Sequence, residues 1–116
     1  MDVNIPASAY LSAREGLLRS RQEVAEVTRD FDVVAMPTVP CIAPPIGALA
    51  ELDACLAINN QVLKNTRFLN LLNRCAITIP IQRPGQIPVG LMLVGEANED
   101  KRLFAIAGGI EKVLKG

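Results

Sequence analysis

Two short apolar segments joined by a proline-glycine turn constrain the fold of this chain more than any other feature. Residues 76–81 read Ala-Ile-Thr-Ile-Pro-Ile, and residues 89–94 read Val-Gly-Leu-Met-Leu-Val. The first segment is rich in β-branched side chains, which favour strands. The second is apolar on both faces, as in strands that are covered on both sides. Between them, Arg83-Pro84-Gly85-Gln86 predicts a turn, so we expect two neighbouring strands with other elements packed on both faces.

The first part of the chain predicts a long helix, a strand and an irregular loop. Residues 7–30 predict one helix with a single apolar stripe. The stripe repeats every seven residues, at Tyr10, Leu17, Val24 and Phe31. Residues 31–36 predict a strand, and residues 37–47 contain five prolines and glycines, which excludes a regular helix or a central strand. The flanking strand favours a packed loop over a proline-rich docking peptide for an SH3-like domain.

The second half of the chain predicts two further helices. Asn65 or Thr66 can cap the first of these helices through a side-chain oxygen. Asn98 can cap the second helix, which contains the last residues of the chain. Residues 48–63 fit either a helix or an irregular loop with one helical turn, and the sequence leaves this choice open. The order of helix, strand, loop, helix, two strands and helix indicates the α/β class.

Composition excludes several classes of function. The 12 basic and 12 acidic residues balance, which argues against nucleic acid as a partner because phosphate binding needs a basic surface. No apolar run is long enough to span a membrane, and the first residues do not resemble a secretory signal. The three cysteines form no close pair and the chain has no histidine, so we expect no metal, no cofactor and a reducing, cytoplasmic compartment.

The chain is apolar for its size. Half of its residues are hydrophobic but only 3% are aromatic, and the mean hydropathy is +0.28. A domain of 116 residues has a large surface for its volume, and that surface needs polar side chains. We therefore expect an aliphatic core and some apolar faces that a larger body, or a second copy of the chain, must cover.

Three stretches carry ordered residue patterns. Residues 65–80 read NTRFLNLLNRCAITIP, residues 87–95 read IPVGLMLVG, and residues 31–47 read FDVVAMPTVPCIAPPIG. They resemble NTxPFNxxGxPAxxxP, GLPVGLQLVG and DxLxxPTxPxxAPPxG, which are typical of the C-terminal part of the amidase signature family. Asn73 stands where a glycine is usual in that pattern, and Cys75 stands where a proline is usual.

The resemblance has implications for fold and catalysis. It implies that residues 1–116 are a single segment of the C-terminal part of an amidase signature domain, with its strands in a large mixed sheet flanked by helices. The family's catalytic Ser–Ser–Lys residues lie upstream of the matched region. The chain has no Gly-Gly-Ser-Ser run, and its serines, Ser8, Ser12 and Ser20, all fall on the first predicted helix. No catalytic residue is therefore assigned, and the chain alone is expected to be inactive.

The same resemblance implies four residues that line the substrate pocket. In the family, the loop after the Pro-Thr pair and the Asn-Thr turn lie on the substrate side of the sheet. The matching residues here are Pro37, Thr38, Asn65 and Thr66. A purely structural interpretation competes with this one, in which Thr66 caps a helix and Asn70 bonds to neighbouring backbone.

Two classes of function remain open. The first is the C-terminal segment of an amidase-type hydrolase that cleaves carboxamide C–N bonds through an acyl-serine, with the catalytic residues outside this chain. An amide substrate is then a partner only together with the missing region. The alternative is a non-catalytic, self-associating structural or interaction protein, or a truncated amidase remnant. It is motivated by the start at Met1 and the strands that are apolar on both faces.

Overall fold

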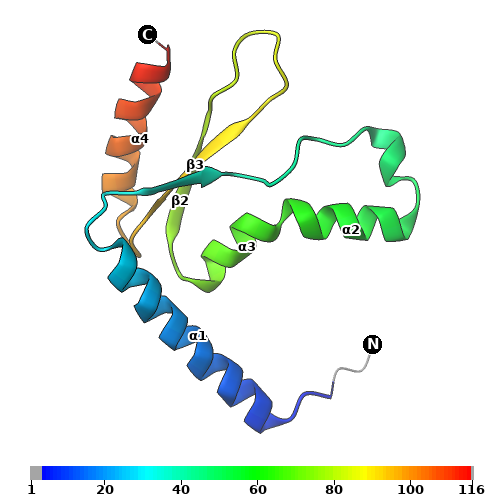
Figure 1. Cartoon of the computed structure of the whole chain (residues 1–116), viewed down its shortest axis with the longest axis vertical. Coiled ribbons are helices and arrows are strands. Elements are labelled where there is room, and N and C mark those ends of the chain that lie inside the picture. The colour runs from blue at the N-terminus through cyan, green and yellow to red at the C-terminus, as the bar shows by residue number, and fades with distance from the viewer. Residues whose placement is uncertain (1–3, 116) are drawn as a thin grey trace.

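The computed structural model describes residues 4–115, which form helices around one small sheet (Figure 1). In chain order the elements are α1 (Ala7–Thr28), β1 (Val34–Pro37), the 3-10 helix η1 (Ile46–Leu49), α2 (Leu52–Val62), α3 (Lys64–Leu71), β2 (Cys75–Pro80), β3 (Gly90–Gly95) and α4 (Asp100–Lys115). The predicted α/β class is confirmed. The segment that the sequence left open is mostly helical, because η1 and α2 occupy it.

The sheet has three strands in the order β1-β3-β2, and both pairs are antiparallel. Its central strand is β3, the segment that the sequence predicts to be covered on both sides. Met92 of β3 lies opposite Met36 of β1 and Thr78 of β2. Pro37 and Pro80 each end one of the two outer strands, where the missing N–H of a proline is tolerated.

Successive side chains of β3 enter two separate cores. Leu93 packs with Ile79 of β2 and with Leu103 and Ala107 of α4. Met92 and Val94 instead pack with Leu69 of α3. Since neighbouring strand residues point to opposite faces, α4 covers one face of the sheet and α3 covers the other. The expectation of a two-sided strand is therefore confirmed.

The turn between β2 and β3 also forms as predicted. The backbone N–H of Gln86 donates to the carbonyl of Arg83 at 3.0 Å. Gly85 has a φ of 80°, a value that glycine adopts without steric cost. Pro84 precedes it in the position where its fixed φ favours the turn.

The predicted cap at Asn65 or Thr66 is wrong. Helix α3 begins at Lys64, directly after Leu63, which separates it from α2. The carbonyl of Leu63 accepts the N–H of Arg67 at 2.9 Å, and no side chain caps this helix end. The Thr66 hydroxyl donates back to the carbonyl of Leu63 at 3.3 Å. Because α2 continues almost directly into α3, the preceding backbone replaces the expected side-chain cap.

Two asparagines adopt left-handed backbone conformations. Asn73 has a φ of 57° and occupies the position where the resemblance expects glycine. Apart from glycine, asparagine is among the residues that best tolerate such a φ. Asn98 has a φ of 64°, so the prediction that it caps the last helix is wrong. The carbonyl of Glu99 accepts the N–H of Leu103, which places Glu99 at the cap of α4 and Asn98 in the turn before it.

The chain between α1 and β1 differs from the prediction. Helix α1 ends at Thr28 rather than at residue 30, and β1 starts at Val34 rather than at Phe31. The N–H of Phe31 donates to the carbonyl of Thr28 in a turn, and Asp32 is bound by Arg102 of α4. Phe31 and Asp32 therefore lie outside the strand ladder, and the strand starts three residues late, although Val33 still packs against the core around Leu93.

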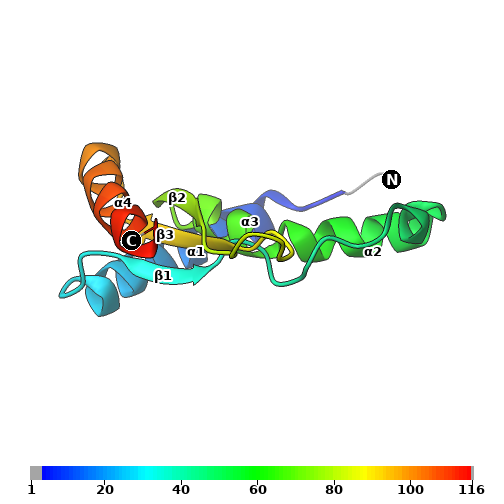
Figure 2. The same cartoon turned by 90° about the horizontal axis from the view of Figure 1, so that it is seen from above.

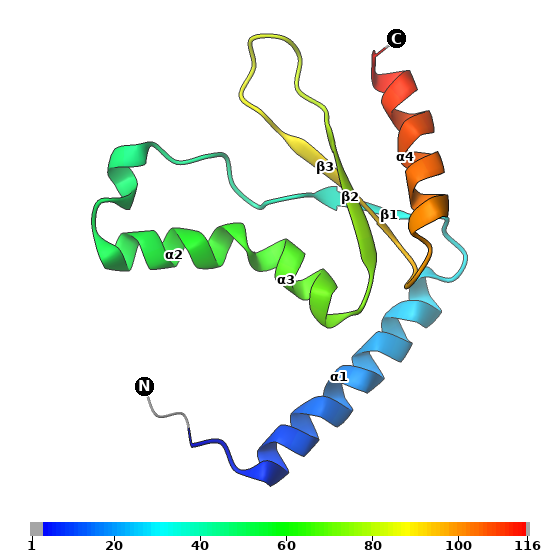
Figure 3. The same cartoon turned by 180° about the vertical axis from the view of Figure 1, so that it is seen from behind.

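The predicted apolar stripe of α1 forms but is not covered. No residue of α1 is buried, and Tyr10 is 63% exposed. Figure 1 and Figure 3 show α1 leading away from the sheet, with its N-terminal half far from the strands. The apolar face of this helix therefore takes no part in either core of the chain.

The molecule is a thin slab of 54 × 43 × 19 Å, as the view from above shows (Figure 2). Its accessible surface is 9019 Å², whereas a compact monomer of 12.5 kDa exposes about 6,200 Å². Its radius of gyration is 17.6 Å, against about 13 Å for a compact domain of this length. The expectation of uncovered apolar faces is confirmed, since many large hydrophobic side chains are exposed.

Candidate functional site

Three of the four residues predicted to line a pocket meet at the end of β1. The side-chain amide of Asn65, on α3, donates to the carbonyl of Pro37 at 2.8 Å. The backbone N–H of Thr38 donates to the carbonyl of Gly90, at the start of β3, at 3.0 Å. Thr66 is the exception, because its hydroxyl donates to the carbonyl of Leu63, just before its own helix. The first turn of α3 is thereby tied to the loop that leaves the sheet.

Two further residues complete this cluster, and the sequence pattern predicted neither. The hydroxyls of Thr38 and Thr78 lie 3.1 Å apart and share a hydrogen bond. Gly90 lies beneath them: a Cβ there would be 2.6 Å from Thr78 Cγ2 and 2.7 Å from Thr38 Oγ1. A lone glycine inside an apolar strand is the signal that could have indicated this close approach.

Hollows flank the cluster on two sides. One, of about 350 Å³, lies between the proline-rich loop and residues 88–90, and Pro37 lines it. Another, of about 260 Å³, lies between α3 and the sheet, and Thr66 and Thr78 line it. Hydroxyls can donate to and accept from a neutral polar group. No member of the Pro37, Thr38, Asn65, Thr78 and Gly90 cluster is ionisable, so the cluster can orient an uncharged group but cannot activate a nucleophile.

Replacing Gly90 with alanine is expected to disrupt this cluster. The new methyl group forces both threonine side chains to move, and their shared hydrogen bond is lost, which costs about 1–3 kcal/mol. Urea denaturation followed by circular dichroism measures this cost. Gly108→Ala in α4 is the matched control, because nothing lies within 4 Å of its Cβ. Gly108→Ala should be no less stable than the native chain, because alanine favours a helix over glycine. If Gly90→Ala is also as stable as the native chain, the close approach at Gly90 is not structurally important.

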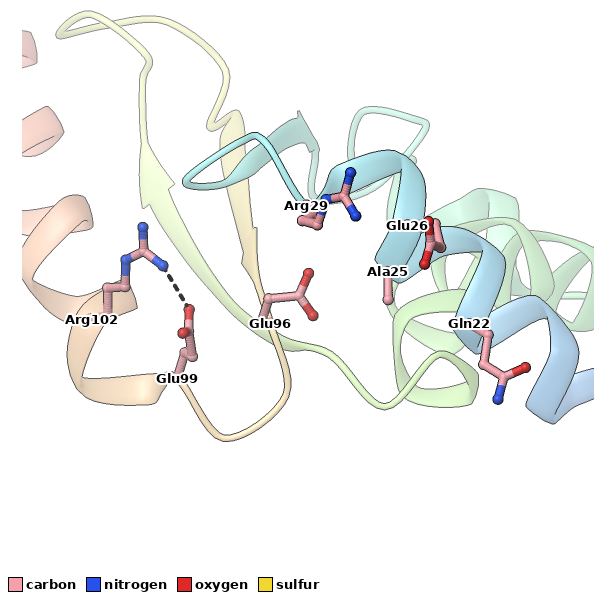
Figure 4. A pocket seen from close by; sticks show the side chains of 7 residues that line it. All are labelled: Gln22, Ala25, Glu26, Arg29, Glu96, Glu99 and Arg102. Carbon is pink, nitrogen blue, oxygen red and sulfur yellow. Dashed lines mark hydrogen bonds and ion pairs between the residues drawn. The ribbon is translucent and has the colours of Figure 1, made fainter.

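A third hollow, of about 500 Å³, is lined by charged side chains from α1, the end of β3 and α4 (Figure 4). Arg102 of α4 bonds to Glu99 at 3.1 Å and to Asp32. The hydrogen bond to Asp32, and after it the bond to Glu99, raise the pKa of Arg102 above its ordinary value. Glu96 pairs with Arg74, so ion pairs here join α4 and the end of β3 to other parts of the chain.

Residues 4–115 contain no group of three or more histidine, cysteine, aspartate or glutamate side chains that could hold a metal ion. The three cysteines are free and partly buried rather than fully buried. The thiol of Cys75 donates to the carbonyl of Glu96 at 2.9 Å. It therefore links the start of β2 to the residue after β3. Among residues 4–115, no helix is both long enough and apolar enough to cross a membrane.

Comparison with known proteins decides the family. A family model described as Amidase matches residues 2–104. The chain belongs to the amidase family. The three residue patterns predicted this membership, and the prediction is confirmed. The small antiparallel sheet and its helices are therefore part of an amidase domain.

Curated amidase-family relatives match along most of the chain. It is 33% identical over 106 residues to 2-amino-5-chloromuconic acid deaminase of Comamonas testosteroni, and the match covers 90% of this chain and 23% of that protein. It is 32% identical over 105 residues to a glutamyl-tRNA(Gln) amidotransferase subunit of Sulfurisphaera tokodaii, with 90% and 22% covered. The amidase chain thus spans less than a quarter of the length of these relatives.

Solved structures support the same assignment. A glutamyl-tRNA(Gln) amidotransferase subunit of Thermotoga maritima superposes with a TM-score of 0.67 at 25% identity, over 84% of this chain and 21% of that one. The S177A allophanate hydrolase of Kluyveromyces lactis superposes with a TM-score of 0.73 at 25% identity, over 87% and 16%. The described elements therefore have the arrangement found in one part of larger amidase-fold proteins.

Proposed function

We propose that this chain is the C-terminal segment of an amidase-type hydrolase that acts on carboxamide C–N bonds. The single observation that carries the proposal is the comparison with the Comamonas relative, in which 90% of this chain corresponds to only 23% of that protein. The proposed reaction proceeds through an acyl-serine: a serine attacks the carboxamide carbon, ammonia or an amine leaves, and water releases the acid. The proposed catalytic Ser–Ser–Lys residues lie outside this chain.

The proposed role of this segment is to build one wall of the substrate pocket. Pro37, Thr38, Asn65 and Thr66 are the proposed lining residues, as the resemblance implies. The hydrogen bond from Asn65 to the carbonyl of Pro37 supports a positioning role, in which Asn65 holds the loop. The hydroxyls of Thr38 and Thr78 offer a donor and an acceptor, which suit the N–H and C=O of a neutral carboxamide.

The purified 116-residue chain is expected to release no ammonia from simple aliphatic or aryl carboxamides. Amide hydrolysis needs an activated nucleophile, a proton shuttle and oxyanion donors, and the cluster described above has no ionisable group to activate a nucleophile. Ammonia release is measured by a coupled assay, with a full-length amidase as the positive control. More than one turnover per chain that persists through repurification would show that this chain has its own catalytic centre.

The size of the native polypeptide tests the proposed function most directly. An antibody against α4 is used on extracts of the source cells. A band several times heavier than 12.5 kDa, whose upstream peptides contain the serines and the lysine, is the expected result. A band at 12.5 kDa with no separate amidase chain in the same complex would overturn the proposal and favour the alternative, a non-catalytic protein that covers its apolar faces by self-association.

A further inference from the structure

A wide, mainly apolar groove of about 600 Å³ lies between α1 and the end of α3. We refer to it as the α1 groove. Leu18 is 47% exposed and Tyr10 is more exposed still. The groove is lined by Tyr10, Ala13, Arg14, Leu17, Leu18, Arg21 and Leu71. It lies apart from the threonine cluster and contains none of the proposed pocket residues.

Polar bonds hold α1 in a position that leaves this groove open. Arg21 donates through Nε to the carbonyl of Leu71 at 2.7 Å, and Arg74 donates to the hydroxyl of Thr28 at 2.9 Å. Helix α1 has 22 residues and is therefore about 33 Å long, but none of its residues is buried. A periodic apolar stripe on such a helix indicates a packing partner, and the described part of this chain does not supply one.

The amount of uncovered surface indicates that the partner is large. The chain exposes 9019 Å², which exceeds the surface of a compact monomer of its mass by about 2,800 Å². A standard protein interface covers about 800 Å² on each partner. The excess is several times that area, so the partner resembles the remainder of a folded domain more than a short peptide.

The charges at the α1 groove favour one kind of partner over a second copy. Arg14 and Arg21 line the groove, and no acidic residue does. Within the described part of the chain, neither arginine takes part in a salt bridge. A two-fold pair of α1 grooves brings four arginines into one interface, because a symmetric interface uses the same patch twice, and the groove supplies no carboxylate to pair with them. An aliphatic segment that carries a carboxylate fits this surface better.

We propose that the α1 groove docks an amphipathic segment of the catalytic part of an amidase domain. That segment presents aliphatic side chains to Tyr10, Leu17 and Leu18, and a carboxylate to Arg14. The inference rests on the proposed function, because it takes the catalytic part to exist, either earlier in the same polypeptide or as a separate chain. It adds the surface and the chemistry through which the two parts join.

Photo-crosslinking in the source cells tests this proposal. p-Benzoylphenylalanine is placed at position 10, where it resembles the native tyrosine in shape, and at position 19 as the matched control. Arg19 is exposed on α1 and does not line the groove. The expected result is a crosslink from position 10 to a peptide of amidase catalytic sequence, about tenfold more abundant than any from position 19. Leu18→Asp should reduce that crosslink about tenfold, because it removes the burial of a leucine.

Each other outcome counts against the proposal. A crosslink from position 10 to a second copy of this chain overturns it in favour of self-association. No crosslink, or an equal yield from both positions, shows that the α1 groove is not a docking surface. The antibody experiment separates these failures from that of the proposed function: a heavy native band with a catalytic region, but no crosslink at position 10, leaves the amidase proposal intact. Arg19→Asp is the control for Leu18→Asp.

Discussion

Replacing Leu93 with alanine is expected to destabilise the chain by about 2–5 kcal/mol, the cost of removing a large aliphatic side chain from a closed core. Leu93 is 1% exposed and is packed between β2 and α4, against Ile79, Leu103 and Ala107. Single domains have only about 5–15 kcal/mol of total stability, and this chain has few buried residues. The variant is therefore expected to be largely unfolded under conditions in which the native chain is folded.

Urea denaturation followed by far-ultraviolet circular dichroism measures the loss. Ile46→Ala is the matched control, because Ile46 is an aliphatic residue in η1 that is 90% exposed. We expect its free energy of unfolding to stay within about 0.5 kcal/mol of the native value. A Leu93→Ala chain with the midpoint of the Ile46→Ala chain would show that the α4 side of the sheet is not the main core.

The elements that the sequence predicts well are those set by local chemistry. The apolar run that ends at Val94 has no polar face, which requires cover on both sides, and β3 is central in the sheet. Pro84 and Gly85 favour a turn by their own backbone preferences, and the turn forms between residues 83 and 86. In each case the information lies within a few neighbouring residues.

The elements that the sequence predicts poorly depend on distant contacts. Asn65 has the side chain of a cap, but its amide bonds to Pro37, 28 residues away in sequence. Phe31 has the hydrophobicity of a strand residue, but its N–H bonds to Thr28 in a turn, and Arg102 of α4 binds its neighbour Asp32. The stripe on α1 correctly predicts an apolar face, but the sequence does not indicate which surface covers that face.

The candidate site shows the same division. The resemblance points to Pro37, Thr38 and Asn65, and the structure brings these three together. It does not point to Thr78 and Gly90, because the sequence does not reveal the register between β2 and β3 that places them beside Thr38. Contact between this cluster and a substrate stays a prediction, and Gly90→Ala tests only its structural part.

Replacing Arg74 with methionine is expected to release the C-terminal end of α1 from the sheet. The Arg74 side chain is 7% exposed, pairs with Glu96, and donates to the hydroxyl of Thr28. Breaking a fully buried ion pair costs about 3–5 kcal/mol. The Glu96 side chain is 42% exposed and can be hydrated once Arg74 is absent, so the expected cost is lower, about 1–3 kcal/mol.

Hydrogen exchange separates a local release from global unfolding. In Arg74→Met we expect faster amide exchange along residues 22–28 of α1, while the amide of Leu93 keeps its protection, because α1 contributes no buried side chain to either core. Arg102→Met is the matched control: it removes an arginine whose ion-pair partner, Asp32, is mostly exposed, and it should leave exchange in α1 unchanged.

A double-mutant cycle assigns the effect to the bond between Arg74 and Thr28. If the contact holds α1, Arg74→Met and Thr28→Val should cost less together than the sum of the two single changes, with a coupling of about 0.5–3 kcal/mol. Additive costs would mean that Arg74 acts mainly through Glu96, between β2 and β3. Helix α1 would then be positioned by Arg21, by the bond from the Thr28 hydroxyl to Glu96 at 3.3 Å, and by the surface that covers its groove.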